Sequence, residues 1–583
     1  MFSTNNTNIK KLKFKYVNFI WYYFLITFVT MFICYPLFKK GYYFVTHEGI
    51  SPLYRTYGVS EAISNGQFPA KVLPNLINGM GYGWSIFYSP LSYDISSLFN
   101  LMGLHVLTSV KLVHMLEIFL SGIFMYVLMN RVTKSSIVAI TASVLYLAAP
   151  YRIVDIYIRN AFAESLAFTI LPIIFLGLYE IVHGNKNRWW ILGIGMGTMF
   201  ITHNITAIYS SFFVIIYLGL NFKNEYRNKL FYFVCVKAMI LALLLSSYFL
   251  LPLLEHKYYG NYAIFSGNFS SSDPEFVHQH SVKFLQFFKH DFYYGISKYL
   301  SEIDNDEMPY LIGFPLLFFS FIGCFMIHKC KFFFNFCFLS AIFLVFIMTP
   351  FFPWHLMPKI LLYIQFPWRL LLFTSFFLST VGGFALVNVT GNWKQLACIT
   401  LLSFLLCIYI YPFIHPNYKL VSVNEIQAKE DITNTTSIGH SIGEYLPIAV
   451  KIDYLKQRDQ NITVIEGKAI IDILNWNGLK IQFRIKPENK KLTIEIPLIY
   501  YLGYKAIITK IDGSKQNLKV NQSPNGLLTV HPQDEGIVTI WYGWTKLSII
   551  GNILTIIGIL WLLYLVILSM IGNKIDKHRI YNS

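Results

Sequence analysis

The feature that most constrains this chain is the recurrence of apolar runs about as long as a bilayer is thick. A helix needs about 20 apolar residues to cross the hydrocarbon core. Runs near this length occur at residues 17–38, 106–130, 135–150, 164–183, 189–203, 205–222, 230–253, 309–328, 331–350, 370–390, 396–413 and 547–571. The sequence therefore predicts a polytopic α-helical membrane protein with about 12 transmembrane helices.

The composition agrees with this class. The 583 residues are 55% hydrophobic and only 13% charged, whereas soluble proteins carry about 25% charged residues. The formal net charge of +17 comes from basic residues scattered between apolar runs, so we attribute it to membrane topology rather than to nucleic-acid binding. The seven cysteines lie nearly all inside apolar runs and predict neither a disulfide framework nor a zinc site.

Basic residues in the connections set the predicted orientation. Residues 86–104 are interrupted by Pro90 and Asp94, and we interpret them as re-entrant or interfacial. Every second connection is then net positive, which places both termini in the cytoplasm. Residues 39–105 and 254–308 become outer loops, and the second of these holds eight acidic residues against four lysines.

Residues 414–546 have a different pattern. Short alternating runs, such as 470–474 and 492–496, are separated by the turn signals Asn477-Gly478, Asp512-Gly513 and Asn525-Gly526. This pattern predicts an extracytoplasmic all-β domain resembling a sandwich. It would follow a membrane domain of residues 1–413, and residues 547–583 would form the final transmembrane helix and a basic cytoplasmic tail.

Charged and polar side chains gather at the predicted outer ends of the helices. Ionisable groups at membrane depth are costly and are therefore candidate functional residues. The candidates are His47, Glu48 and Arg55 in the first outer loop, then Arg152, Asp155, Arg159, Asn160 and Glu164, then His203, and finally Arg369. The predicted topology brings all of them to one face of the bilayer.

These residue types suit one kind of chemistry. An arginine fork binds a phosphate in a bidentate manner, and a carboxylate can deprotonate a hydroxyl group as a general base. A sugar carried on a polyprenyl phosphate requires both at this depth. The structural alternative is simple ion pairing of Glu48 with Arg55, or of Glu164 with Arg159.

Lys111, His114 and Glu117 form a polar stripe within one predicted span, at positions i, i+3 and i+6. This spacing keeps the three side chains on one broad helix face. The stripe is typical of an internal polar network that joins helices, and the alternative is a proton or ion path.

Several motifs resemble a known family. They are Asn65-Gly66-Gln67-Phe68-Pro69, Gly81-Tyr82-Gly83, Phe87-Tyr88-Ser89-Pro90, Pro150-Tyr151-Arg152, Tyr157-Ile158-Arg159-Asn160-Ala161 with Glu164, and Glu444-Tyr445-Leu446-Pro447. With them the chain resembles the bacterial membrane proteins of the 6-pyruvoyl-tetrahydropterin synthase-related family. These are close to the YfhO-like proteins and share the organisation of GT-C glycosyltransferases.

The resemblance implies a GT-C-like fold and a lipid-linked sugar donor. It implies that Glu48 is the catalytic or metal-binding acid and that Arg55, Arg159 and Arg369 hold phosphate. His47, Arg152, Asn160, Glu164 and His203 complete the expected substrate-binding set. The chain departs from the family pattern at Pro52, where we expect a histidine, and it shows no three-histidine zinc site for pterin chemistry.

Two classes of function follow as expectations. The first is a glycosyltransferase of the bacterial plasma membrane, which moves a sugar from a polyprenyl-phosphate carrier to a cell-envelope polymer or lipid at the outer leaflet. The second is a transporter, flippase or scaffold that holds the same precursors without chemistry, and an inactive relative is a third reading. Membrane lipids are expected partners and nucleic acid is not. No cofactor is implied with certainty, although a divalent cation is compatible with Glu48, and the metal ligands stay unknown.

Overall fold

A computed structural model describes most of the chain. It covers residues 18, 20–44, 46–266, 273–289, 308–327, 331–414, 420–422, 443–489 and 491–581. By its contacts the chain divides into two compact units. The first unit comprises Met1–Glu48, Lys111–Ala242 and Ser271–Val421, and the second comprises Gly49–Val110, Leu243–Ser270 and Ser422–Ser583.

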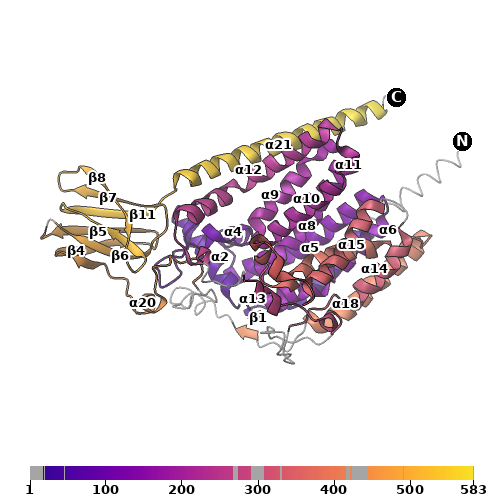
Figure 1. Ribbon diagram of the computed structural model, residues 1–583, viewed down its shortest axis with the longest axis horizontal. Helices are drawn as coiled ribbons and strands as arrows, with labels where there is room; N and C mark the ends of the chain where they lie inside the picture. The colour runs from indigo at the N-terminus through magenta and orange to yellow at the C-terminus, as the bar shows by residue number, and fades with distance from the viewer. Residues whose placement is uncertain are drawn as a thin grey trace. The chain divides into compact units, whose positions relative to one another are not determined.

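Long helices dominate the structure (Figure 1). Within the described residues, nine are long and apolar enough to cross a membrane: Ile20–Phe38, Val106–Thr133, Ser136–Arg159, Phe162–Val182, Lys229–Tyr259, Lys331–Met348, Pro367–Leu386, Asn392–Ile414 and Lys546–Leu568. The prediction of a multi-helix membrane protein is thereby confirmed in its class. The count of about 12 crossings stays a prediction.

The three other predicted spans form shorter helices. These are α9 (Trp190–Thr202), α10 (Asn204–Leu220) and α14 (Phe314–Met326), of 13, 17 and 13 residues. Glycine allows α9 to pack closely against α8 (Phe162–Val182), because a Cβ at Gly177 would lie 2.3 Å from the backbone nitrogen of Leu192. Small residues serve helix packing in membranes in this way.

Aromatic side chains fill much of the first unit. Phe175 of α8 packs against Phe376 and Phe377 of α17 (Leu371–Gly382), with ring centroids 4.8 and 5.3 Å away. Phe336 of α15 (Lys331–Met348) and Phe213 of α10 join the same cluster.

The remaining helices of this unit include α6 (Ser136–Leu147), α7 (Pro150–Val154), α13 (Pro274–Gln279), α16 (Lys359–Leu362) and α18 (Asn392–Ile414), with most of α5 (Val106–Thr133). A short two-stranded sheet pairs β1 (Tyr42–Phe44) with β2 (Leu420–Ser422).

The segment predicted to be re-entrant, 86–104, belongs to the second unit. It contains the end of α3 (Trp84–Phe87) and α4 (Leu91–Leu101), separated at Tyr88–Pro90. At 11 residues α4 is too short to span a bilayer. In the same unit α21 (Lys546–Tyr581) lies against the second half of α12 (Lys229–Tyr259), where the Tyr248 backbone N–H donates to Thr555 Oγ1 at 3.0 Å (Figure 1).

The C-terminal region forms two β-sheets, as its alternating pattern predicts, and one short helix, α20 (Ile452–Gln457), precedes them. One sheet has the order β3-β6-β10-β9 and the other has the order β4-β5-β11-β7-β8. The strands are β3 (Thr463–Glu466), β4 (Ala469–Trp476), β5 (Lys480–Pro487), β6 (Thr493–Ile499), β7 (Tyr504–Lys510), β8 (Lys515–Leu518), β9 (Asn521–Gln522), β10 (Leu527–Val530) and β11 (Gly536–Tyr542). Alternate residues of β5 and β11, such as Phe483 and Ile540, are fully buried. The predicted turn at Asn477-Gly478 joins β4 to β5, and Gly478 takes the positive φ of +75° that this tight turn requires. The exact domain boundaries and the side of the membrane stay predictions.

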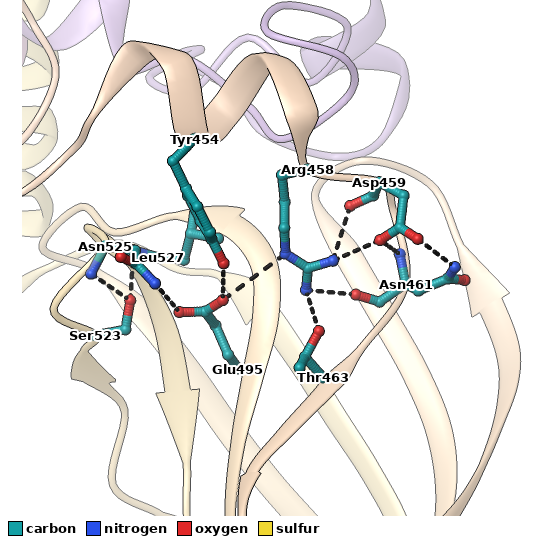
Figure 2. Close-up of polar contacts among 9 residues, drawn as sticks. All are labelled: Tyr454, Arg458, Asp459, Asn461, Thr463, Glu495, Ser523, Asn525 and Leu527. Atoms are coloured by element: carbon teal, nitrogen blue, oxygen red, sulfur yellow. Dashed lines mark hydrogen bonds and ion pairs between the residues drawn. The ribbon is translucent and has the colours of Figure 1, made fainter.

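A buried carboxylate ties the helix α20 (Ile452–Gln457) region to this β domain (Figure 2). Glu495 of β6 is 2% exposed and accepts a hydrogen bond from the Tyr454 hydroxyl at 2.8 Å. Arg458 Nε lies 3.7 Å from the same carboxylate oxygen, and Arg458 also donates to Thr463 Oγ1 at 2.7 Å. The contacts link α20, β3 and β6 and explain the position of this helix.

Glu495→Ala is expected to destabilise the β domain by about 2 kcal/mol, because the Tyr454 hydroxyl loses its acceptor and Arg458 keeps only the exposed carboxylate of Asp459. Limited proteolysis of the full-length protein across a temperature series measures this loss of stability as cleavage within 443–545 at a lower temperature. Glu466→Ala is the matched control on the neighbouring strand, because the Glu466–Lys491 ion pair is largely exposed and contributes little. Equal resistance of Glu495→Ala and the control would contradict a structural role for Glu495.

Candidate functional site

The candidate site lies where the helical segment Ser136–Arg159 ends and α8 begins. Pro150 starts α7, the next turn widens into a π-helix at Asp155–Arg159, and Asn160 takes a left-handed conformation with φ of 55°. A single π-helical turn inside a helix commonly marks a functional site. This break in regular helix geometry presents Arg159 and Glu164 to the same interior region.

Glu164 is the centre of the site. It is 1% exposed, and its Oε1 accepts a hydrogen bond from the Tyr151 hydroxyl at 2.7 Å. Arg159 donates to Glu164 Oε2 at 2.9 Å and also contacts the Asp155 carboxylate. A second guanidinium approaches from far along the chain, since Arg369 Nε lies 3.6 Å from Glu164 Oε2. Two arginines therefore share one buried carboxylate.

Aromatic faces hold both arginines. The Arg159 guanidinium lies 4.6 Å from the Trp368 ring centroid, and that of Arg369 lies 5.0 Å from the Phe366 ring centroid. Arg369 also donates to the Gln365 side chain at 2.8 Å and to the Ile364 carbonyl at 3.0 Å. Such stacking fixes the plane of a guanidinium group, which prepares it for a planar or tetrahedral anion.

The first loop reaches this site through its backbone. The His47 N–H donates to the Ile158 carbonyl at 2.9 Å, and the Glu48 N–H donates to the Arg159 carbonyl at 3.1 Å. The Glu48 carboxylate is close enough to that of Asp155 for an electrostatic interaction. His203, between α9 and α10, is likewise within electrostatic range of Glu164 and Arg369, and its Nδ1 lies 2.7 Å from Thr206 Oγ1.

The structure thus brings together Glu48, His47, Arg159, Glu164, His203 and Arg369 in the first unit. The Glu164–Arg159 ion pair that we considered as a structural alternative is also present. The Arg152 side chain packs against other residues. It is fully buried, and its guanidinium lies 4.6 Å from the Phe168 ring centroid and 5.4 Å from that of Tyr146. The roles of these residues stay predictions.

Arg55 belongs to the second unit, where it has partners of its own. It lies 4.8 Å from the Trp84 ring centroid and donates to the Tyr93 hydroxyl at 3.2 Å. Next to Tyr93, Asp94 accepts a hydrogen bond from the Tyr248 hydroxyl at 3.3 Å, and Lys71 donates to the Tyr248 carbonyl at 2.9 Å. Burial raises the pKa of Asp94 to about 6 and lowers the pKa of Lys71 to about 8.

That cluster of Lys71 and Asp94 was not predicted from the sequence. Asp94 stood out only as an interruption of an apolar run, and Lys71 carried no signal. Within the described residues there is no group of three or more histidine, cysteine or acidic side chains placed to hold a metal ion.

Comparison with known sequences now identifies the family. The sequence model of a membrane-protein family, described as the 6-pyruvoyl-tetrahydropterin synthase-related domain, matches residues 85–413, more than half of the chain. The chain belongs to this family. The resemblance inferred from its motifs is confirmed.

The matched region of this 6-pyruvoyl-tetrahydropterin synthase-related protein contains Arg159, Glu164, His203 and Arg369, and it begins after Glu48. An uncharacterized protein of Lactococcus lactis subsp. cremoris (strain MG1363) is 24% identical over 98% of both chains. A crystal structure of ArnT from Cupriavidus metallidurans bound to undecaprenyl phosphate is 14% identical, with a TM-score of 0.38. That comparison covers 65% of this chain and 62% of ArnT.

Proposed function

We propose that this protein is a glycosyltransferase that moves a sugar from a polyprenyl-phosphate carrier to a cell-envelope acceptor. The observation that supports this most strongly is the convergence of Arg159 and Arg369 on Glu164 within an apolar helical unit. Such buried charges are expensive to maintain in a membrane protein, and function commonly explains their presence. The proposed location is the outer leaflet of a bacterial plasma membrane, with both termini in the cytoplasm.

The two arginines are suited to the phosphate of the carrier. Arg369 Nε–H is buried, and no acceptor within hydrogen-bond distance of it is found in the part of the chain that the structure describes. A phosphate oxygen beside Glu164 would give this N–H an acceptor. The Arg159 guanidinium, which stacks on Trp368, would bind a second phosphate oxygen. Arginine is the residue type that matches phosphate geometry in such a site.

Glu48 is the proposed general base. The acceptor hydroxyl would lose its proton to the Glu48 carboxylate as its oxygen bonds to the anomeric carbon of the sugar. The bond between that carbon and the phosphate oxygen breaks, and the electron pair stays on the polyprenyl phosphate. The arginines would stabilise the charge that develops there. The β domain of the second unit is proposed to orient the acceptor.

Binding of the carrier provides the direct test. In nanodiscs, the full-length protein is expected to bind undecaprenyl phosphate, and Arg369→Gln should weaken this binding by about tenfold through loss of a charge-assisted contact. Microscale thermophoresis with a labelled protein measures the affinity. Arg188→Gln is the matched control, because Arg188 pairs with Glu180 of the same unit and its side chain is 44% exposed.

A radiolabelled polyprenyl-phosphate sugar distinguishes transfer from transport. Appearance of label on an envelope acceptor supports the proposal. Movement of intact carrier between leaflets, without cleavage of the sugar–phosphate bond, would replace it with the flippase reading. Equal affinity of Arg369→Gln and wild type for the carrier would remove Arg369 from the phosphate site.

A further inference from the structure

A second buried polar group lies beside the candidate site. His114 and Glu117, both on α5, are each 1% exposed. His114 Nδ1 lies 2.8 Å from Glu117 Oε1, and His114 Nε2 lies 3.2 Å from the side-chain oxygen of Asn160. This contact joins residues that are 46 positions apart in the sequence. Because Asn160 directly follows Arg159, the contact reaches the edge of the candidate site.

Asn160 controls the direction of the chain at this point. Its φ of 55° ends the π-helical turn that carries Asp155 and Arg159. The backbone then closes on itself, because the Ala161 N–H donates to the Asp155 carbonyl at 3.0 Å and the Phe162 N–H donates to the Asn160 carbonyl at 2.9 Å. A change at Asn160 would therefore alter the placement of Arg159 relative to Glu164.

Both ring nitrogens of His114 are engaged, one by the Glu117 carboxylate and the other by the Asn160 side chain. Glu117 Oε1 also accepts from the Ser165 hydroxyl, and the Thr169 hydroxyl donates to the Glu117 carbonyl at 2.8 Å. The pair is thus anchored on both α5 and α8.

We propose that His114 and Glu117 are positioning residues that hold Arg159 in place through Asn160. This proposal rests on the proposed function, because it assigns the pair to the phosphate-binding side of that site. Neither residue contacts the phosphate itself. Glu117 orients the His114 ring, the ring fixes the Asn160 side chain, and Asn160 sets the turn that presents Arg159.

A double-mutant cycle tests whether the two side chains act through one another. His114→Phe keeps a ring next to Phe162 but removes both ring nitrogens, and Asn160→Gly keeps the left-handed backbone accessible while removing the side-chain amide. Each is expected to weaken binding of undecaprenyl phosphate by about tenfold. The double variant should bind undecaprenyl phosphate less than about twofold more weakly than either single variant.

Thr169→Val is the matched control, because it removes a hydrogen bond to Glu117 without touching the His114–Asn160 contact. The control should bind the carrier as wild type does. A full additional loss from His114→Phe in the Asn160→Gly background would overturn the proposal. If His114→Phe does not accumulate, Asn160→Gly, which leaves the His114–Glu117 pair intact, must still show the loss.

Hydrogen–deuterium exchange provides a readout that needs no ligand. His114→Phe and Asn160→Gly should speed exchange at residues 155–165, and Thr169→Val should leave it unchanged. Unchanged exchange in both variants would overturn the positioning role. Failure of wild-type protein to bind undecaprenyl phosphate would instead count against the proposed function, and the exchange result would still decide whether the pair orders this segment.

Discussion

Replacing Glu48 with glutamine is expected to lower the rate of sugar transfer by about 10²- to 10⁴-fold, the usual contribution of a general base. Glutamine has nearly the same shape but cannot accept the proton of the acceptor hydroxyl. The Glu48 N–H would still donate to the Arg159 carbonyl, so the first loop should keep its place. Transfer of radiolabelled sugar by protein in nanodiscs measures the rate.

Measuring carrier binding distinguishes the proposed role of Glu48 as the base from that of the arginines in the phosphate site. Glu48→Gln should bind undecaprenyl phosphate about as tightly as wild type, because the arginines are unchanged. Glu275→Gln is the control, since Glu275 is an exposed acid on α13 of the same unit. Transfer at the wild-type rate by Glu48→Gln would exclude Glu48 as the base and direct attention to Asp155, the carboxylate with which it interacts.

Removing the carboxylate of Glu164 is expected to have the largest effect on stability. Glu164→Ala leaves the Arg159 and Arg369 cations close together in the interior without the carboxylate they share. Removing one member of a buried ion pair typically costs about 3–5 kcal/mol. A lower midpoint of thermal unfolding in nanodiscs, followed by loss of the monodisperse peak, measures this change.

Two further variants identify the cause. Glu164→Gln keeps an acceptor for the Tyr151 hydroxyl, so its unfolding midpoint should fall less than that of Glu164→Ala. Adding Arg369→Met to Glu164→Ala should recover part of the lost stability, because it removes the cation that pairs with Glu164, whereas Arg159 keeps the Asp155 carboxylate. If Glu164→Ala alone unfolds at the wild-type midpoint, the ion pairs at this site are not what holds the two segments together.

Much of the site could be predicted because its charges are conspicuous in an apolar chain. Residue type and predicted sidedness alone single out Arg159, Glu164, His203 and Arg369. The structure places Arg159, His203 and Arg369 around the carboxylate of Glu164. Arg152 and Arg159 could not be told apart in this way. They are seven residues apart, which is close to two helical turns, but the π-helical turn shifts the phase between them.

Other features depend on contacts between distant parts of the chain. His114 meets Asn160 across 46 residues, and Arg55 finds its partners around Trp84 and Tyr93 in the second unit. No local pattern in the sequence indicates either contact. The Lys71–Asp94 cluster is similar, since both residues meet Tyr248, which lies more than 150 residues further along the chain.

The sequence by itself determined that the chain is a multi-helix membrane protein with a β region before its last helix. It could do so because bilayer thickness sets the length of apolar runs and strand alternation sets the period of the β region. Only the tertiary structure decided that Arg159 and Arg369 share Glu164 and that Arg152 does not. Those pairings follow from one π-helical turn, one left-handed residue and the packing of segments about 200 residues apart.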